Sequence, residues 1–164
     1  MKTATVFGSL SNETSPDFDS IFHILKQNNI QKVFIGGYYG QLKEFTAKCQ
    51  EHNIQVALVI TQKGKDLGYG SNDGIEEISV EKYFDKKSLL YSSADLFIFL
   101  PTEKIGLGLL SEIIDLLEYS IIYCKIVKIE LLQIVFMGPT YKAVVDDILT
   151  RTGNVLSNNI KYVY

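Results

Sequence analysis

The amino-acid sequence predicts a single α/β domain with a doubly wound, mostly parallel sheet and helices on both faces. Short apolar runs rich in β-branched and aromatic residues alternate along the chain with segments of helical periodicity, the pattern of a parallel sheet with crossover helices. The chain has 164 residues, of which 46% are hydrophobic and 21% charged, so it can bury one substantial core. No linker, internal repeat or low-complexity tract divides it, and we expect one domain over residues 1–164.

Strands are predicted at short apolar runs, each closed by a glycine, a proline or a polar cluster. Their continuous hydrophobicity is typical of strands that are buried on both faces of a sheet. In chain order the runs are TATVF (residues 3–7), KVFIG (32–36), QVALVI (55–60), DLFIFL (95–100) and LQIVFM (132–137).

Helices are predicted between these strands, where apolar residues recur at helical spacing. Ser15 and Pro16 suit the N-cap and the first position of the first helix, and Gly153 can end the last one. The predicted helices cover residues 15–29, 41–53, 80–94, 107–122 and 140–151. Right-handed crossovers then give a Rossmann-like sheet, in which ligands bind at the carboxyl ends of the strands.

Two segments carry a weaker pattern. Residues 62–74 are rich in glycine and polar residues, and we expect a loop there. Between Ile122 and Leu131 the sequence leaves two alternatives open, a continued helix or a strand.

Composition and charge exclude several classes of protein. The net charge is −3 and the lysines are scattered, so we expect no nucleic-acid partner. Cys49, Cys124, His23 and His52 lack the number and spacing of a disulfide framework or a metal site, and we expect neither a metal nor a cofactor. The first apolar segment is too short for a signal peptide, which predicts a cytoplasmic protein. Charged residues interrupt the apolar stretch 107–137, so we expect no membrane span.

Glycine-bearing loops follow three of the predicted strands. They are FGSLS (residues 7–11), which holds Gly8 and Ser9, IGGYYGQ (35–41) and KIGLGLLSE (104–112). All three loops should open at the same edge of the sheet. Because glycine lets the backbone approach a ligand and helix N-termini attract anions, together they predict a phosphate cradle. The alternative is that these glycines only make tight turns and that Ser9 caps a helix.

Two well-known phosphate motifs are missing from the chain. The first loop has only Gly8 and lacks the Gly-x-Gly-x-x-Gly pattern of dinucleotide sites, and no P-loop pattern occurs anywhere. The sequence therefore gives no support to a nicotinamide-dependent dehydrogenase or a P-loop NTPase.

Three segments, GGYYGQLKEFTAKCQEHNIQV, DKKSLLYSSADLFIFLP and GLGLLSE, resemble the LOG family, long labelled lysine-decarboxylase-like, in their order and distances. The resemblance runs from about Thr3 to Leu149. It implies a Rossmann-like fold and hydrolysis of the N-glycosidic bond of nucleoside 5′-monophosphates to free base and ribose 5-phosphate. It also implies homodimers built near the helix over residues 107–122.

Position by position, the resemblance implies a set of site residues. Glu112 takes the place of the family's glutamate and Lys86 that of its arginine, so these two are the candidate catalytic residues. The candidate phosphate- or nucleotide-binding residues are Gly8, Ser9, Gly36, Gly37, Gly40, Lys87, Gly106, Gly108 and Leu109. In the family's reaction a carboxylate beside the anomeric carbon stabilises the positive charge that builds on the ribose.

The sequence departs from the family pattern at several of these positions. Lys86 keeps a positive charge but lacks the planar fork of arginine, and Leu109 replaces a threonine hydroxyl. Lys104 and Ile105 stand where the family has Pro-Gly. Three hypotheses follow: a nucleoside-monophosphate hydrolase, a non-catalytic binder of a nucleotide or other phosphorylated molecule acting as carrier or sensor, and a protein-interaction domain.

Other side chains have two interpretations each. Tyr38 and Tyr39 can stack on a base or pack against a neighbouring chain. Glu112 and Lys86 can also be ordinary exposed residues of helices. The helix over 107–122 has more apolar residues than one sheet face needs, which favours a homodimer over a monomer in which the C-terminal segment covers it.

Overall fold

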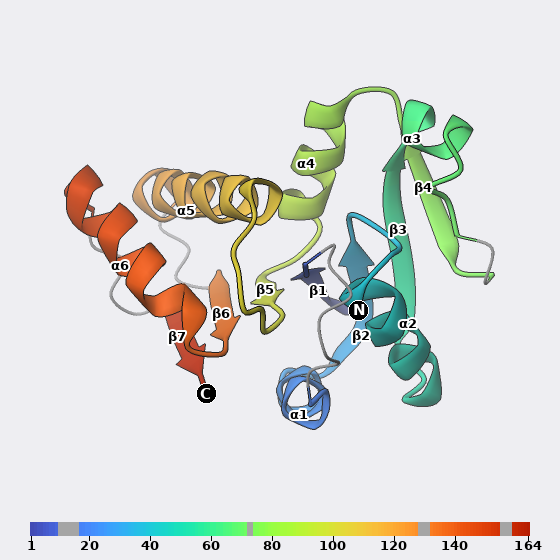
Figure 1. Ribbon diagram of the computed structural model, residues 1–164, viewed down its shortest axis with the longest axis horizontal. Helices are drawn as coiled ribbons and strands as arrows, with labels where there is room; N and C mark the ends of the chain where they lie inside the picture. Colours follow the sequence, from blue (N-terminus) through green and yellow to red (C-terminus); the bar gives the residue numbers. More distant parts are fainter. Residues whose placement is uncertain (10–16, 72–73, 128–131, 155–158) are drawn as a thin grey trace.

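The computed structural model describes residues 1–9, 17–71, 74–127, 132–154 and 159–164, with the side chains of 123–127 excepted. It contains a seven-stranded sheet in the order β4-β3-β2-β1-β5-β6-β7, and every neighbouring pair of strands is parallel. The strands are β1 (Lys2–Phe7), β2 (Ile30–Ile35), β3 (Gln55–Thr61), β4 (Glu76–Val80), β5 (Leu96–Phe99), β6 (Gln133–Met137) and β7 (Ile160–Val163). The predicted α/β, Rossmann-like, doubly wound fold is confirmed (Figure 1).

Helices cover both faces of this sheet. They are α1 (Asp19–Gln27), α2 (Gln41–Glu51), α3 (Gln62–Asp66), α4 (Tyr83–Ser92), α5 (Leu107–Val127) and α6 (Thr140–Thr152). The side chains of α1 and α2 belong to one core cluster, and those of α4, α5 and α6 belong to the cluster on the opposite face. In Figure 1, α4 and α5 accordingly lie above the sheet and α1 and α2 below it.

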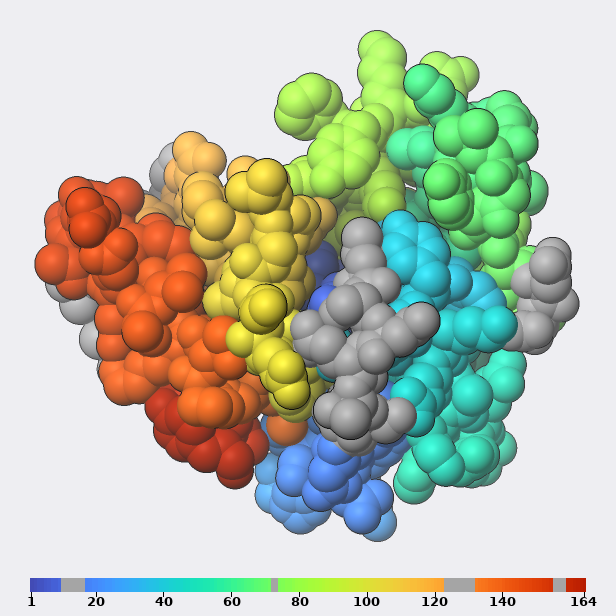
Figure 2. Space-filling view, in the orientation of Figure 1, coloured from blue at the N-terminus to red at the C-terminus, as the bar shows by residue number. Residues whose placement is uncertain are grey.

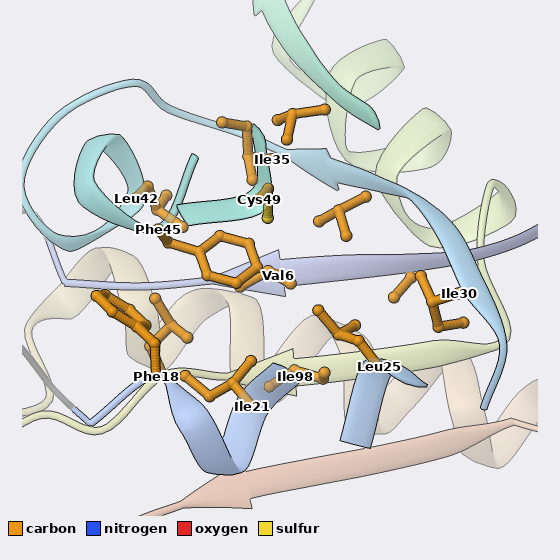
Figure 3. Packing of buried hydrophobic residues seen from close by; sticks show 14 of the residues in the cluster. Val6, Phe18, Ile21, Leu25, Ile30, Ile35, Leu42, Phe45, Cys49 and Ile98 are labelled. Atoms are coloured by element: carbon orange, nitrogen blue, oxygen red, sulfur yellow. The ribbon is translucent and has the colours of Figure 1, made fainter. Parts of the chain in front are cut away.

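The core on the α1 and α2 face joins the middle strands to both helices. Figure 3 shows Phe18 and Ile21 on one side and Phe45 of α2 on the other, with Val6 of β1 beside the Phe45 ring and Ile98 of β5 beside Ile21. Phe45 and Ile21 are fully buried. This packing fixes the start of α2 against the carboxyl end of β1, where the glycine loops open.

The structure adds three elements that the sequence patterns did not indicate. β4 and β7 lie at the two ends of the sheet, and within the described ranges each pairs with one neighbouring strand. The short helix α3 and the turn after it replace much of the loop expected over residues 62–74. Of the segment between Ile122 and Leu131, where a helix and a strand were both open, the helix α5 covers the part up to Val127, and residues 128–131 lie outside the described residues.

One of the two helix ends predicted from the sequence can be compared with the structure. Gly153 ends α6 in the left-handed conformation at φ 65°, as predicted. The N-cap prediction for Ser15 and Pro16 lies outside the described residues. No helix in the described ranges is long and apolar enough to cross a membrane.

Candidate functional site

A cavity of about 430 Å³ opens at the carboxyl edge of the sheet, where the strand order reverses between β1 and β5. This is the place where doubly wound folds bind ligands, and the volume is that of a small-molecule pocket. Figure 2 shows a hollow where the yellow segment at the start of α5, the green segment at the start of α4 and the cyan β2–α2 loop meet. The lining residues are Val6, Phe7, Gly8, Ser9, Gly36, Gly37, Tyr39, Leu42, Tyr83, Lys86, Leu90, Gly106, Leu107, Gly108, Leu109 and Glu112.

The structure therefore brings together most of the predicted site residues. Eight of them line the cavity beside Glu112: Gly8, Ser9, Gly36, Gly37, Lys86, Gly106, Gly108 and Leu109. Gly40 and Lys87 do not line it. Gly40 instead has φ 56° immediately before α2, a conformation that favours glycine, so local backbone geometry explains it.

The glycines of the cavity serve different physical needs. A Cβ at Gly36 would stand 3.0 Å from Leu90 Cδ1 and 3.3 Å from Lys86 Cε, so a side chain there would collide with α4. Gly106 and Gly108 are different, because a Cβ at either would meet no atom within 4 Å, and neither has a positive φ. Neither backbone conformation nor packing within the described chain therefore requires these two glycines.

The start of α5 forms one wall of the cavity. The N–H of Leu110 donates to the carbonyl of Gly106 at 2.9 Å, which makes Gly106 the residue before the first helical turn. The first N–H groups of a helix have no carbonyl partner within the helix, and they carry its positive dipole end. This wall therefore offers N–H donors that glycine leaves accessible to an anion.

Lys86 projects from α4 to the β2–α2 loop. Its Nζ lies 3.7 Å from the position that a Cβ of Gly36 would take, and 5.9 Å from the centroid of the Tyr83 ring. Burial lowers the pKa of Lys86 below its ordinary value and the charge of Lys87 adds to this, although Glu112 acts in the opposite direction. Among the described residues Lys86 forms no ion pair. Its ammonium group is thus a half-buried positive charge at the cavity wall.

Glu112 lies one turn into α5, and its carboxylate is held from behind. Its Oε2 accepts a hydrogen bond of 2.6 Å from the Tyr91 hydroxyl, and its Oε1 lies 3.9 Å from Lys87 Nζ. Burial and the bond to Glu112 raise the pKa of Tyr91 far above its usual range, so Tyr91 is a neutral donor. Glu112 is therefore fixed in orientation at the cavity wall.

Lys87 belongs to a polar cluster beneath the cavity. Its Nζ donates to Asp115 and, at 3.0 Å, to the Ser111 hydroxyl. Burial opposes the charged form of Lys87, but the hydrogen bond from Lys87 to Asp115 and the charge of Glu112 outweigh it and raise the pKa. Asp115 therefore largely neutralises the charge of Lys87. Lys87 does not line the cavity itself, but it interacts with Glu112, which does.

Gln41, the first residue of α2, joins two of the glycine loops. Its Oε1 accepts from the Ser9 N–H at 3.2 Å, and its Nε2 donates to the Pro101 carbonyl at 2.7 Å. Gln41 is almost fully buried, with 3% of its surface exposed. The residue thereby ties the loop after β1 to the loop after β5, and sequence reasoning gave it no role.

Comparisons by sequence find nothing. No family model and no curated protein matches the chain. Structural comparison, in contrast, finds the fold in proteins of known structure. The fold is shared with molybdenum cofactor proteins. In two of these structures the match covers 99% of this chain and 89% of the other chain.

The first of these is the molybdenum cofactor binding protein from the phototrophic bacterium Rippkaea orientalis, with a TM-score of 0.66 and 12% identity. The second is the molybdenum cofactor carrier protein MCP from Chlamydomonas reinhardtii, with a TM-score of 0.63 and 12% identity. At this identity the likeness establishes the fold, and it does so over nearly the whole length of all three chains.

Proposed function

We propose that this chain binds a phosphorylated small molecule in the cavity and serves as a carrier or sensor of it. The observation that carries the proposal is the ammonium group of Lys86, which lines the cavity without an ion pair in the described chain. The same cavity is walled by the glycine-bordered start of α5. A phosphate group would receive a charge-assisted hydrogen bond from Lys86 and N–H donors from the helix.

The fold supports the binding interpretation over catalysis. Two proteins that share it are named for binding or carrying the molybdenum cofactor, which is a phosphorylated small molecule. The replacement of the LOG-type arginine and threonine by Lys86 and Leu109 points the same way, because a binder does not need groups that act only in a transition state. The open space at Gly106 and Gly108 disfavours a protein-interaction domain, in which side chains would fill it.

Hydrolysis of a nucleoside 5′-monophosphate is the second candidate, and the position of Glu112 favours it. Glu112 lines the cavity, and Tyr91 and Lys87 fix its orientation. A fixed carboxylate can stabilise developing charge on a ribose and orient water. In this case Glu112 is the catalytic residue and Lys86 binds the phosphate.

A single experiment compares the two candidates. The purified protein is incubated with AMP, its thermal unfolding is followed, and free adenine is measured by chromatography. We expect AMP at 100 times its Kd to add about 2.7 kcal/mol to the free energy of unfolding, without release of adenine. Release that disappears in Glu112→Gln would establish hydrolysis instead. Absence of stabilisation by AMP, by the molybdenum cofactor and by ribose 5-phosphate would overturn the binding proposal.

Gly108→Ala is expected to raise the stability of the free protein and to lower its affinity for AMP. No atom of the described residues lies within 4 Å of the new Cβ and Gly108 is inside α5, so alanine should stabilise the free protein by about 0.5–1 kcal/mol. The methyl group would occupy space that a phosphate needs, so affinity for AMP should fall. Calorimetric titration and denaturant unfolding of the same variant measure both effects. Gly153→Ala is the control, because its φ of 65° predicts lower stability with unchanged affinity.

A homodimer is also proposed, built on the outer face of α5. Large apolar side chains on this helix are exposed, namely Leu107 at 87%, Ile114 at 44% and Ile122 at 49%. An apolar face of this kind is typical of a subunit interface. Ile114→Glu should convert the dimer to a monomer in sedimentation velocity, whereas Leu67→Glu, at an exposed leucine after α3, should not. A monomeric wild-type protein would contradict the proposal.

A further inference from the structure

The ring of Tyr39 has a defined seat at the cavity. Its Cζ, Oη and Cε2 atoms lie 3.3, 3.4 and 3.6 Å from the position that a Cβ of Gly37 would take. A Cβ at position 37 would therefore crowd the ring and require it to shift slightly. Gly37 has no positive φ, so its backbone conformation does not demand glycine. The close approach of the Tyr39 ring is therefore what explains Gly37.

A second residue supports this ring from another element. Tyr69, in the turn after α3, packs edge-on against Tyr39, with ring centroids 6.2 Å apart and an interplanar angle of 64°. This arrangement is favourable for aromatic pairs. Tyr69 lies in the segment 62–74, to which the sequence patterns gave no role. The Tyr39 ring is thus held by Gly37 and Tyr69, yet it lines the cavity and is 37% exposed.

The cavity therefore combines two kinds of surface. Lys86 and the start of α5 offer a positive charge and N–H donors, whereas Tyr39 and Tyr83 offer aromatic rings. Burial raises the pKa of Tyr39, and the nearby Tyr69 and Tyr83 add to this, so the ring is neutral at physiological pH. A ligand with only a phosphate and a sugar would leave the aromatic surface without a partner.

We propose that the ligand of this cavity carries a planar unsaturated ring besides its phosphate, and that this ring stacks on Tyr39 as held by Gly37 and Tyr69. The inference rests on the proposed function, since it concerns the same cavity. It makes Tyr39 a specificity-determining residue that distinguishes nucleotide-like or other heterocyclic phosphates from sugar phosphates. Stacking on an aromatic side chain tolerates different rings, because every unsaturated ring has a π-face.

The test measures binding of AMP, flavin mononucleotide and ribose 5-phosphate by calorimetric titration. The first two carry planar rings, and ribose 5-phosphate is AMP without its base. We expect the wild-type protein to bind the ring-bearing phosphates about 5- to 100-fold more tightly than ribose 5-phosphate. Tyr39→Leu should remove this difference and leave the affinity for ribose 5-phosphate unchanged. Tyr39→Phe should preserve it, which separates stacking from hydrogen bonding by the hydroxyl.

Gly37→Ala is the second variant, because its Cβ would crowd the Tyr39 ring while leaving Tyr39 in the chain, and it should reduce the difference between ring-bearing phosphates and ribose 5-phosphate by less than Tyr39→Leu does. Tyr164→Leu, at a tyrosine that is 77% exposed at the end of the chain, is the matched control. Equal affinity of the wild-type protein for all three compounds would overturn the inference and leave the proposed function standing, and so would unchanged discrimination in Tyr39→Leu. If none of the three compounds binds, the inference fails, and the proposed function fails with it only when the molybdenum cofactor does not bind either.

Discussion

Lys86→Gln is expected to weaken the binding of a phosphorylated ligand about 10- to 100-fold, the range for loss of a hydrogen bond to a charged group. Lys86 is the positive charge that lines the cavity without an ion pair in the described chain, so a phosphate loses its main electrostatic partner. Titration of AMP by calorimetry measures the change. Lys161→Gln is the matched control, because Lys161 is exposed on the edge strand β7 and its loss alters the net charge equally. Equal weakening in both variants would contradict a local role for Lys86.

The lowered pKa of Lys86 predicts that a rise in pH weakens ligand binding but stabilises the free protein. Burial lowers the pKa of Lys86 in the folded protein. Affinity for a phosphate should therefore fall as the pH rises through this lowered pKa, because the ammonium loses its proton. The free protein should become more stable over the interval between the folded and the unfolded pKa of Lys86, where only the unfolded chain keeps the proton.

The variant Lys86→Arg tests whether deprotonation of Lys86 causes the fall in affinity at high pH. A guanidinium group stays protonated throughout the range, so the fall in affinity with pH should disappear in this variant. It would also show whether a planar fork, as in the LOG-type arginine, strengthens the grip on phosphate. An unchanged pH profile in Lys86→Arg would assign the titration to another group.

The central strands could be predicted from sequence because burial on both faces leaves an uninterrupted apolar run. β5, with Leu96 and Phe99 at its ends, is fully buried. The edge strands could not be predicted in this way. β4 and β7 carry Glu76, Glu77 and Lys161 and have only exposed and half-buried positions, and β3 and β6 supply their pairing. Tertiary pairing rather than local pattern creates these two strands.

The cavity likewise contains residues that sequence patterns predicted and residues that they did not. Gly36, Gly106 and Glu112 could be predicted because each lies at the end of a recognisable strand or in a motif, and they meet in one cavity. Tyr83 gave no signal, because it joins the cavity only when α4 docks beside the β2–α2 loop. Lys87 shows the converse, since a motif position indicated phosphate binding whereas the folded chain pairs it with Asp115. A sequence pattern identifies the element that carries a residue, but the helix face that points to the ligand depends on packing.

Gln41→Leu is expected to destabilise the protein by about 2–4 kcal/mol, because it removes at once two partly buried hydrogen bonds of an almost fully buried side chain. For a chain of this size such a change should lower the Tm by roughly 5–12 °C. The loops after β1 and β5 would also lose the residue that joins them. Since Gly8 and Gly106 lie near these ends and line the cavity, affinity for AMP should fall as well.

The isosteric variant Gln41→Glu separates the joining role from simple packing. Glutamate keeps an acceptor for the Ser9 N–H but cannot donate to the Pro101 carbonyl while ionised, and it places a carboxylate against that carbonyl. We therefore expect Gln41→Glu to be destabilised at neutral pH and to regain part of its stability when acid protonates the carboxyl group. Gln50→Leu, at an exposed glutamine of the same helix, should change neither stability nor affinity appreciably. If Gln41→Leu lowered the Tm as expected but bound AMP as tightly as the wild-type protein, Gln41 would be a core residue and would have no part in holding the two loops at the cavity.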